Sequence, residues 1–125
     1  MVIGGFSQGK RAYAEKLYPN IKWTDGTNCS FEELFFCEGI INFHEYIRRW
    51  MKNREGTERA EELAEDMIER NPGLILVCSE IGCGLVPADP FDRMYREETG
   101  RICTKLALFS ERIDRVVCGI GTRIK

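Results

Sequence analysis

The chain lacks the features that mark membrane proteins and nucleic-acid-binding proteins. No apolar run approaches the roughly 18 residues that cross a bilayer, so neither a transmembrane span nor a signal peptide is expected. The formal net charge of -2 and the pI near 5.5 leave no broad basic surface. Nucleic acid and anionic membranes are therefore disfavoured as partners, and we expect a cytoplasmic protein.

The chain also lacks a convincing metal-binding pattern. It has one histidine, and its six cysteines include no CxxC pair, which is poor spacing for zinc. Cys37, Cys78 and Cys118 lie in apolar, strand-like runs, where a reduced cysteine behaves as a small hydrophobe. The 125 residues, 43% of them hydrophobic, suffice for one domain with a modest core, so residues 1–125 are expected to form a single domain.

What the sequence does contain is a glycine-rich loop near its amino terminus. A short apolar run, residues 1–3, leads into Gly4-Gly5-Phe6-Ser7-Gln8-Gly9-Lys10-Arg11, and a helical pattern follows. This is the context of the GxxxxGK[ST] loop, whose backbone N–H groups surround phosphates while its lysine reaches the β and γ phosphates. We therefore predict that Gly4–Arg11 binds GTP or ATP. The alternative is a glycine-rich turn in which Lys10 is merely solvated.

The last loop position departs from this pattern. Arg11 stands where a Ser or Thr hydroxyl would ligate Mg²⁺, and its positive charge should weaken a cation site there. As a phosphate contact, however, Arg11 adds a hydrogen-bond donor. Two interpretations stay open: a kinase site with weakened magnesium binding, and an anion site that works without metal.

The remaining pattern predicts strands and helices in alternation. Strands are predicted over 21–24, 34–37, 74–78 and 114–118, and helices over 42–52, 57–70 and within 89–111. Ser30 with Glu33 has the spacing of a capping box, and Thr57 is a predicted helix cap. Strands separated by helices indicate a P-loop NTPase-like α/β fold, with a parallel sheet, helices on both faces and ligands at the carboxyl ends of the strands.

Two acidic residues follow predicted strands. Glu38 comes after the run that ends at Cys37, and Glu80 comes after Cys78 and Ser79. A carboxylate that faces a phosphate loop can ligate Mg²⁺ or accept a proton from an attacking hydroxyl. Glu38 is thus a candidate metal ligand and Glu80 a candidate base, the alternative being that both are solvated or cap the next helix.

Residues around Glu80 belong to a longer pattern. Segments 79–87, 93–97, 100–101 and 116–125 resemble, in order and spacing, the adenosylcobinamide kinase / adenosylcobinamide-phosphate guanylyltransferase family of cobalamin biosynthesis. The loop Gly4–Arg11 is similar to the family's amino-terminal GGxxSGKS, and Phe36–Ile40 is similar to its central strand with an acidic residue.

This resemblance implies a P-loop fold, assembly as a homotrimer, and two reactions. The family phosphorylates the aminopropanol hydroxyl of adenosylcobinamide, and then attaches GMP through a guanylylated histidine. By position, Gly4, Gly5, Gly9 and Lys10 would hold the triphosphate, and Glu80 would lie beside the reacting groups, with Glu38 facing them from the neighbouring strand.

Arg93 and Arg96 match a pair of arginines in the family, and guanidinium groups suit phosphate recognition. The alternative for both arginines is a salt-bridged helix face with Glu97 and Glu98.

The chain departs from the family at further positions. The family's guanylylated histidine lies between the first helix and the central strand, but Tyr18–Leu34 contains no histidine. His44 comes after that strand and is interpreted as an ordinary helix residue, and Cys103-Thr104 replaces an Asn-Gln pair. Two functions follow: a shortened kinase without guanylyl transfer, or a degenerate module that binds nucleotide or corrinoid or joins a full-length family member.

Overall fold

The structure is a computed structural model that describes residues 1–54, 59–82 and 86–125. Strands and helices alternate along most of the chain, as predicted. In chain order the elements are β1 (Val2–Gly4), α1 (Lys10–Leu17), β2 (Trp23–Asp25), the 3₁₀ helix η1 (Phe31–Phe35), β3 (Gly39–Ile41), α2 (Phe43–Asn53), α3 (Ala60–Arg70), β4 (Ile75–Ser79), α4 (Pro90–Phe109), β5 (Asp114–Val117) and β6 (Ile120–Arg123). Thr57, the predicted cap of α3, lies outside the described residues.

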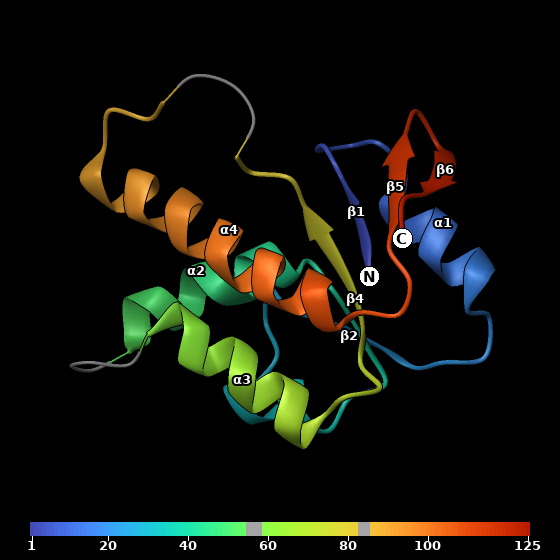
Figure 1. The fold of residues 1–125 in the computed structure, drawn as a ribbon, viewed down its shortest axis with the longest axis horizontal. Coiled ribbons are helices and arrows are strands. Elements are labelled where there is room, and N and C mark those ends of the chain that lie inside the picture. Colours follow the sequence, from blue (N-terminus) through green and yellow to red (C-terminus); the bar gives the residue numbers. More distant parts are fainter. Residues whose placement is uncertain (55–58, 83–85) are drawn as a thin grey trace.

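In the described chain the strands form one sheet in the order β2-β3-β4-β1-β5-β6 (Figure 1). All neighbours are parallel except β5 and β6, which form an antiparallel hairpin. In the register of β1, Gly4 is opposite Ser79 on one side and Val116 on the other. The carboxyl ends of β1, β4 and β5 therefore meet at one edge of the sheet, where the loop that follows β1 begins.

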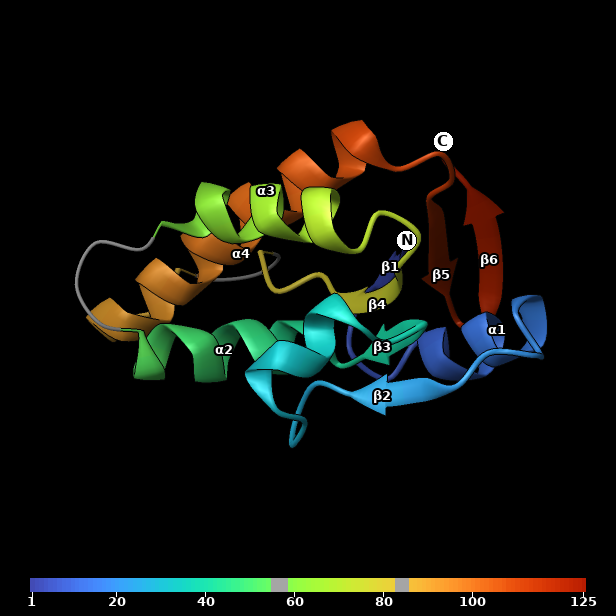
Figure 2. The same ribbon diagram turned by 90° about the horizontal axis from the view of Figure 1, so that it is seen from below.

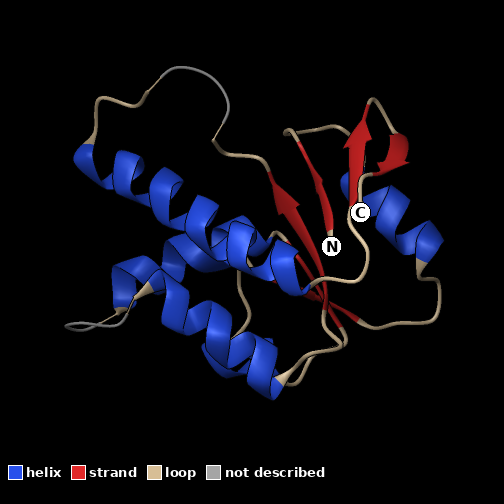
Figure 3. Cartoon of the chain, in the orientation of Figure 1, coloured by secondary structure: helices blue, strands red, loops and turns tan. Residues whose placement is uncertain are grey.

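Helices lie on both sides of the sheet (Figure 2). Alternate side chains of the strands enter two separate cores, one on each face. Leu76 and Cys78 pack with α2, α3 and α4, whereas Val77 packs with Ala14 of α1. This is the period-two alternation of a strand that is buried on both sides. The P-loop NTPase-like α/β fold, with helices on both faces of a mostly parallel sheet, is confirmed (Figure 3).

The predicted strand over residues 34–37 is wrong. The segment Phe31–Phe35 forms a 3₁₀ helix, and the Ser30 N–H donates to Glu33 Oε2 at 3.2 Å, as the capping-box spacing predicts. Phe36 is 72% exposed, so the apolar run is not a buried strand. The strand here is β3, which begins at Gly39, and Glu38 consequently precedes the strand instead of ending it.

The hairpin of β5 and β6 fixes α1 on the sheet. The sequence predicted one strand over 114–118 and did not predict β6. The chain turns at Cys118 and Gly119, both with positive φ, into β6. A Cβ on Gly121 would lie 2.1 Å from the Tyr13 ring, so only glycine leaves room for that ring. The Tyr13 hydroxyl donates to the buried Asp114 carboxylate at 3.0 Å, which ties the helix after the loop to β5.

Candidate functional site

The predicted phosphate loop, Gly4–Arg11, joins the carboxyl end of β1 to the first turn of α1. Ser7 and Gly9 have φ of 54° and 87°, a left-handed conformation that turns the chain back towards the helix. Lys10 is the first residue of α1, and its side chain is only 9% exposed. Its Nζ donates to the Gly5 carbonyl at 2.6 Å, so the ammonium group lies within the loop, where the motif requires it.

The turn between β5 and β6 anchors this loop. Gln8 accepts from two backbone N–H groups, through its carbonyl from Gly119 and through Oε1 from Cys118, each at 2.7 Å. A Cβ on Gly9 would lie 3.2 Å from the Cα of Gly119, which shows how closely the two backbones pack. The predicted ligand-binding residue Gln8 therefore also has a structural role.

A pocket of about 400 Å³ lies against the loop and is lined by Ser7–Ala12, Glu15, Ile41, Asn42, His44 and Val77. Its floor comes from the carboxyl end of β3 and the start of α2. Asn42 has a positive φ of 54° there, and its Nδ2 donates to Asp25 Oδ1 at 3.1 Å. Asn42 is not a predicted site residue and His44 is predicted to be an ordinary helix residue, yet both line the pocket next to the loop Gly4–Arg11.

Glu80 lies at the same edge, immediately after β4. Its N–H donates to the Gly4 carbonyl at 2.8 Å, which joins the end of β4 to the first residue of the loop. Its carboxylate pairs with Arg115 of β5, with Nε 3.2 Å from Oε1. Burial lowers the pKa of Lys10, and the charges of Cys78 and Glu80 oppose that shift. The structure thus brings the two predicted catalytic residues, Lys10 and Glu80, into electrostatic contact.

On the α4 side of the sheet, Glu80 borders a second pocket, of about 320 Å³. Its other lining residues are mainly apolar or small: Met1, Ile3, Cys78, Ser79, Ile81, Gly82, Arg96, Thr99, Gly100, Cys103, Thr104 and Ala107. Cys103 and Thr104, which stand in place of the family's Asn-Gln pair, form part of this wall. Glu80 and Arg96 are the charged residues of a lining that is otherwise mainly apolar or small, so the pocket suits a largely apolar ligand with a polar end.

A family model described as cobinamide kinase / cobinamide phosphate guanyltransferase matches residues 34–124. The chain belongs to this family. The bifunctional adenosylcobalamin biosynthesis proteins CobU of Salmonella typhimurium and Escherichia coli K12 are each 38% identical to it over 52 residues. Each alignment covers 42% of this chain and 29% of the relative, so the matched segment is less than a third of either relative.

Membership of this family confirms the resemblance, and the curated relatives that the chain matches are named as adenosylcobalamin biosynthesis proteins. The matched residues 34–124 begin after the phosphate loop. The case for a phosphate site in this family member therefore rests on the loop geometry.

In the described residues, no helix is long and apolar enough to span a membrane.

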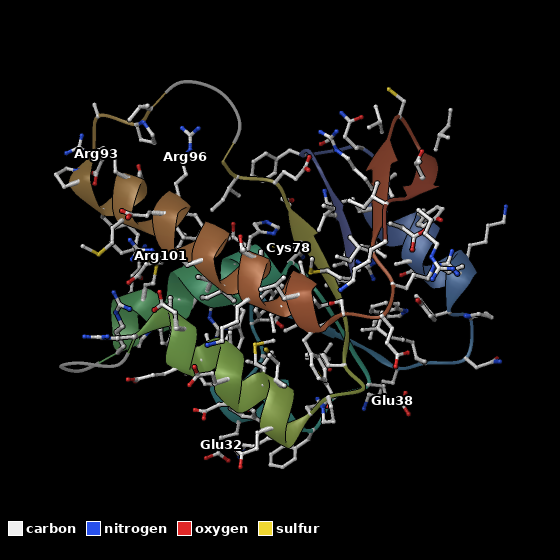
Figure 4. The ribbon with its side chains drawn as sticks, in the orientation of Figure 1. Glu32, Glu38, Cys78, Arg93, Arg96 and Arg101 are labelled. Carbon is white, nitrogen blue, oxygen red and sulfur yellow. The ribbon has the colours of Figure 1, made fainter. Side chains whose placement is uncertain are left out.

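The paired arginines donate hydrogen bonds to backbone carbonyls of described residues that precede α4. Arg93 donates to the carbonyls of Pro87 and Ala88 at 3.2 and 2.7 Å, and Arg96 donates to the carbonyl of Gly82. Figure 4 shows both on the amino-terminal half of α4. Of the two, only Arg96 lines a pocket described above, the one beside Glu80. Their contact with phosphate stays a prediction.

The glutamates of α4 that the alternative names form ion pairs with other arginines. Glu97 pairs with Arg101, and Glu98 pairs with Arg54 at 2.8 Å.

Glu38 does not face the loop, contrary to the prediction. It precedes β3, at the opposite edge of the sheet, and its Oε2 accepts the Lys22 N–H at 2.6 Å (Figure 4). Because strands of a parallel sheet run in one direction, a residue before a strand lies a full strand length from the ligand edge. The prediction that Glu38 binds metal at the phosphate site is therefore wrong.

The donors at the loop do not fit a magnesium site built from the protein. Arg11 offers no oxygen, and its Nε pairs with Glu15 Oε1 at 2.9 Å on the surface of α1. Among the described residues, no group of three or more His, Cys, Asp or Glu side chains could hold a metal ion.

Proposed function

We propose that this member of the cobinamide kinase family binds GTP or ATP at Gly4–Arg11 and transfers the terminal phosphoryl group to the hydroxyl of adenosylcobinamide. The observation that supports this most directly is the 2.8 Å hydrogen bond from the Glu80 N–H to the Gly4 carbonyl. It holds a carboxylate at the mouth of a loop whose buried lysine suits a polyphosphate. A candidate base and a candidate phosphate site are thus adjacent.

In the proposed reaction, the alcohol oxygen attacks the γ-phosphorus while its proton passes to the Glu80 carboxylate. The bond between the γ-phosphorus and the β–γ bridging oxygen breaks, and the nucleoside diphosphate leaves with that electron pair. Lys10 offsets the negative charge on the phosphate oxygens, and such electrostatic stabilisation and positioning account for most of catalysis in phosphoryl transfer. Guanylyl transfer is not part of the proposal, because Tyr18–Leu34 contains no histidine.

The 320 Å³ pocket beside Glu80 is the proposed site for the arm of the acceptor that carries the hydroxyl. Its walls are largely apolar, and Glu80 lies on its lining. An alcohol placed with its carbon chain between β1 and α4 would present its oxygen to Glu80. The pocket is too small for a corrin ring, which would remain outside it.

Enlarging Gly100 should block this pocket. Gly100 is on the lining of the pocket and a Cβ there meets nothing within 4 Å, so the pocket wall has room for the Gly100→Leu side chain without a backbone clash. We expect kcat/KM for the acceptor to fall about tenfold or more, chiefly through KM, because overfilling a packed site costs about 1–3 kcal/mol. Nucleotide affinity, measured by calorimetry, should not change.

Gly100→Ala is the matched control for that variant. It shares the change in helix propensity but adds only a methyl group. Equal acceptor kinetics for Gly100→Leu and the wild type would place the acceptor elsewhere.

Incubation of the protein with adenosylcobinamide and GTP or ATP tests the whole proposal. Mass spectrometry should detect phosphorylated adenosylcobinamide and no GMP covalently attached to the protein. Nucleotide binding without product would instead favour the second candidate, a degenerate module that binds nucleotide or corrinoid or serves as a partner subunit. That candidate is supported by the absence of a hydroxyl group at position 11, where the chain has Arg11.

Trimer formation, expected from the resemblance, is a separate proposal that light scattering can test.

A further inference from the structure

His44 is held in one orientation at the carboxyl edge of the sheet. Its Nδ1 accepts the backbone N–H of Ser79, the last residue of β4, at 3.2 Å. Its carbonyl accepts from the Tyr95 hydroxyl at 2.8 Å, and its ring makes an edge contact with Phe6 of the loop at 5.7 Å between centroids. The residue is 6% exposed and lines the pocket of the phosphate loop. Contacts with β4 and the loop therefore fix the ring, and the hydrogen bond from Tyr95 of α4 holds the backbone of the residue.

The hydrogen bond from Ser79 determines which ring nitrogen carries the proton. Since a backbone N–H only donates, Nδ1 must be the unprotonated nitrogen. Burial lowers the pKa of His44, the charge of Lys10 acts in the same direction, and Glu45 opposes them. The ring is therefore neutral near pH 7, and its proton is on Nε2.

The Nε2–H group has no hydrogen-bond partner within the described part of the chain. The Glu45 carboxylate is the acid nearest in sequence, and its Oε1 is 3.8 Å from Nε2, beyond hydrogen-bond range. Lys10 is the charged loop residue that acts on the ring, and as an ammonium it cannot accept a hydrogen bond. A fixed donor beside a buried lysine is suited to an anionic oxygen.

We propose that His44, as its neutral Nε2–H tautomer held by Ser79, donates a hydrogen bond to an anionic oxygen of the polyphosphate bound at Gly4–Arg11. The inference rests on the proposed function, because it takes this loop to be a phosphate site. It also gives the chain's one histidine a binding role distinct from nucleophilic attack. In this tautomer the Nε2 lone pair is part of the ring π-system, so Nε2 cannot attack a phosphorus atom.

Nuclear magnetic resonance of the full chain tests the tautomer directly. With one histidine in the sequence, the imidazole ¹⁵N signals need no assignment by mutation. At pH 7.5, without ligand, we expect a neutral ring with Nδ1 unprotonated and Nε2 protonated. A ring protonated at Nδ1 would overturn the inference, whatever nucleotide the protein binds.

Two substitutions separate the donor from the structural contact. In His44→Gln the amide nitrogen reaches the position of Nε2, so a donor to the ligand is kept while the acceptor for Ser79 is lost. In His44→Asn the amide oxygen lies near the position of Nδ1, so the acceptor for Ser79 is kept and the donor to the ligand is lost. A purely structural histidine would be replaced better by Asn, and a ligand-binding one better by Gln.

Inorganic tripolyphosphate is the probe for these variants, because it tests the anion site without a base or a sugar. We expect His44→Asn to lower its affinity roughly tenfold or more, the loss typical of a hydrogen bond to a charged group. His44→Gln should bind within about threefold of the wild type but melt at a lower temperature, because the Ser79 N–H loses its acceptor. Thermal melting monitored by circular dichroism checks that all three proteins are folded.

The outcomes distinguish this inference from the proposed function. Full affinity in His44→Asn, with the wild type binding GTP or ATP, would overturn the role of His44 alone. The expected pattern with tripolyphosphate, without binding of either nucleotide, would support His44 and overturn the proposed function. Absence of binding to tripolyphosphate and to both nucleotides would overturn both.

Discussion

Replacing Lys10 by methionine is expected to lower the affinity for GTP and ATP by roughly 10- to 100-fold. Lys10 is a residue that is 9% exposed, and methionine is similar to the apolar part of the lysine side chain, so the apolar contacts of its stem are kept. Methionine lacks the ammonium group, however. That group now donates to the Gly5 carbonyl at 2.6 Å within the loop, and in the complex it would contact phosphate oxygens. A hydrogen bond to a charged group contributes about 1.5–3 kcal/mol, which sets the expected range.

Isothermal titration calorimetry measures the loss, and Lys16→Met is the matched control. Lys16 lies on the same helix and is exposed, so its substitution removes the same charge without touching the loop. Affinity should be unchanged in Lys16→Met, apart from a small effect of net charge that added salt suppresses. If the two variants bound GTP equally well, the loop would be a glycine-rich turn whose lysine has no part in binding.

The sequence predicted the elements whose patterns are local. The structure confirms β4, which was predicted from its unbroken apolar run, and the predicted helices α2 and α4. The parallel order then follows from helices that connect successive strands. For the same reason Glu80, which follows β4, lies next to the loop Gly4–Arg11, and its role there stays a prediction.

The failure at residues 34–37 had a physical cause. A four-residue apolar run is too short for periodicity to separate a strand from a helical turn. Its residues do not share one environment: Leu34 is fully buried and Phe36 is 72% exposed. The capping pair Ser30 and Glu33 indicates that a helical turn begins there. With a helical turn over these residues, the strand begins at Gly39. Glu38 then precedes the strand and lies at the edge opposite the predicted phosphate site.

His44 and Asn42 could not be assigned from the sequence, because their role depends on which strands are neighbours. The sheet order places the end of β3 beside β4, and His44 then meets the Ser79 N–H across 35 positions of sequence. Composition and spacing carry no information on that contact. A correct boundary for β3 would have supplied a signal, since residues directly after a strand of a parallel sheet face the ligand edge.

Glu80→Gln is expected to lower the turnover of adenosylcobinamide phosphorylation by roughly 10²- to 10⁴-fold, the contribution typical of a general base. The amide has nearly the same shape, and the backbone hydrogen bond to Gly4 does not depend on the side chain. Nucleotide affinity should therefore stay within about threefold of the wild type, since the loop is not altered. Single-turnover assays at saturating nucleotide and acceptor separate this loss of chemistry from weaker binding.

The ion pair of Glu80 with Arg115 requires its own control, because Glu80→Gln weakens that pair as well as removing the base. Arg115→Gln removes the same pair, at 3.2 Å, and leaves the carboxylate in place. The Arg115 side chain is half exposed, and exposed pairs contribute about 1 kcal/mol or less, so turnover should fall no more than about fivefold. Equal losses in the two variants would mean that Glu80 acts only by positioning the hairpin strand. A large loss confined to Glu80→Gln would assign the proton transfer to its carboxylate, because the variants share the broken pair and differ in whether a carboxylate remains beside the loop.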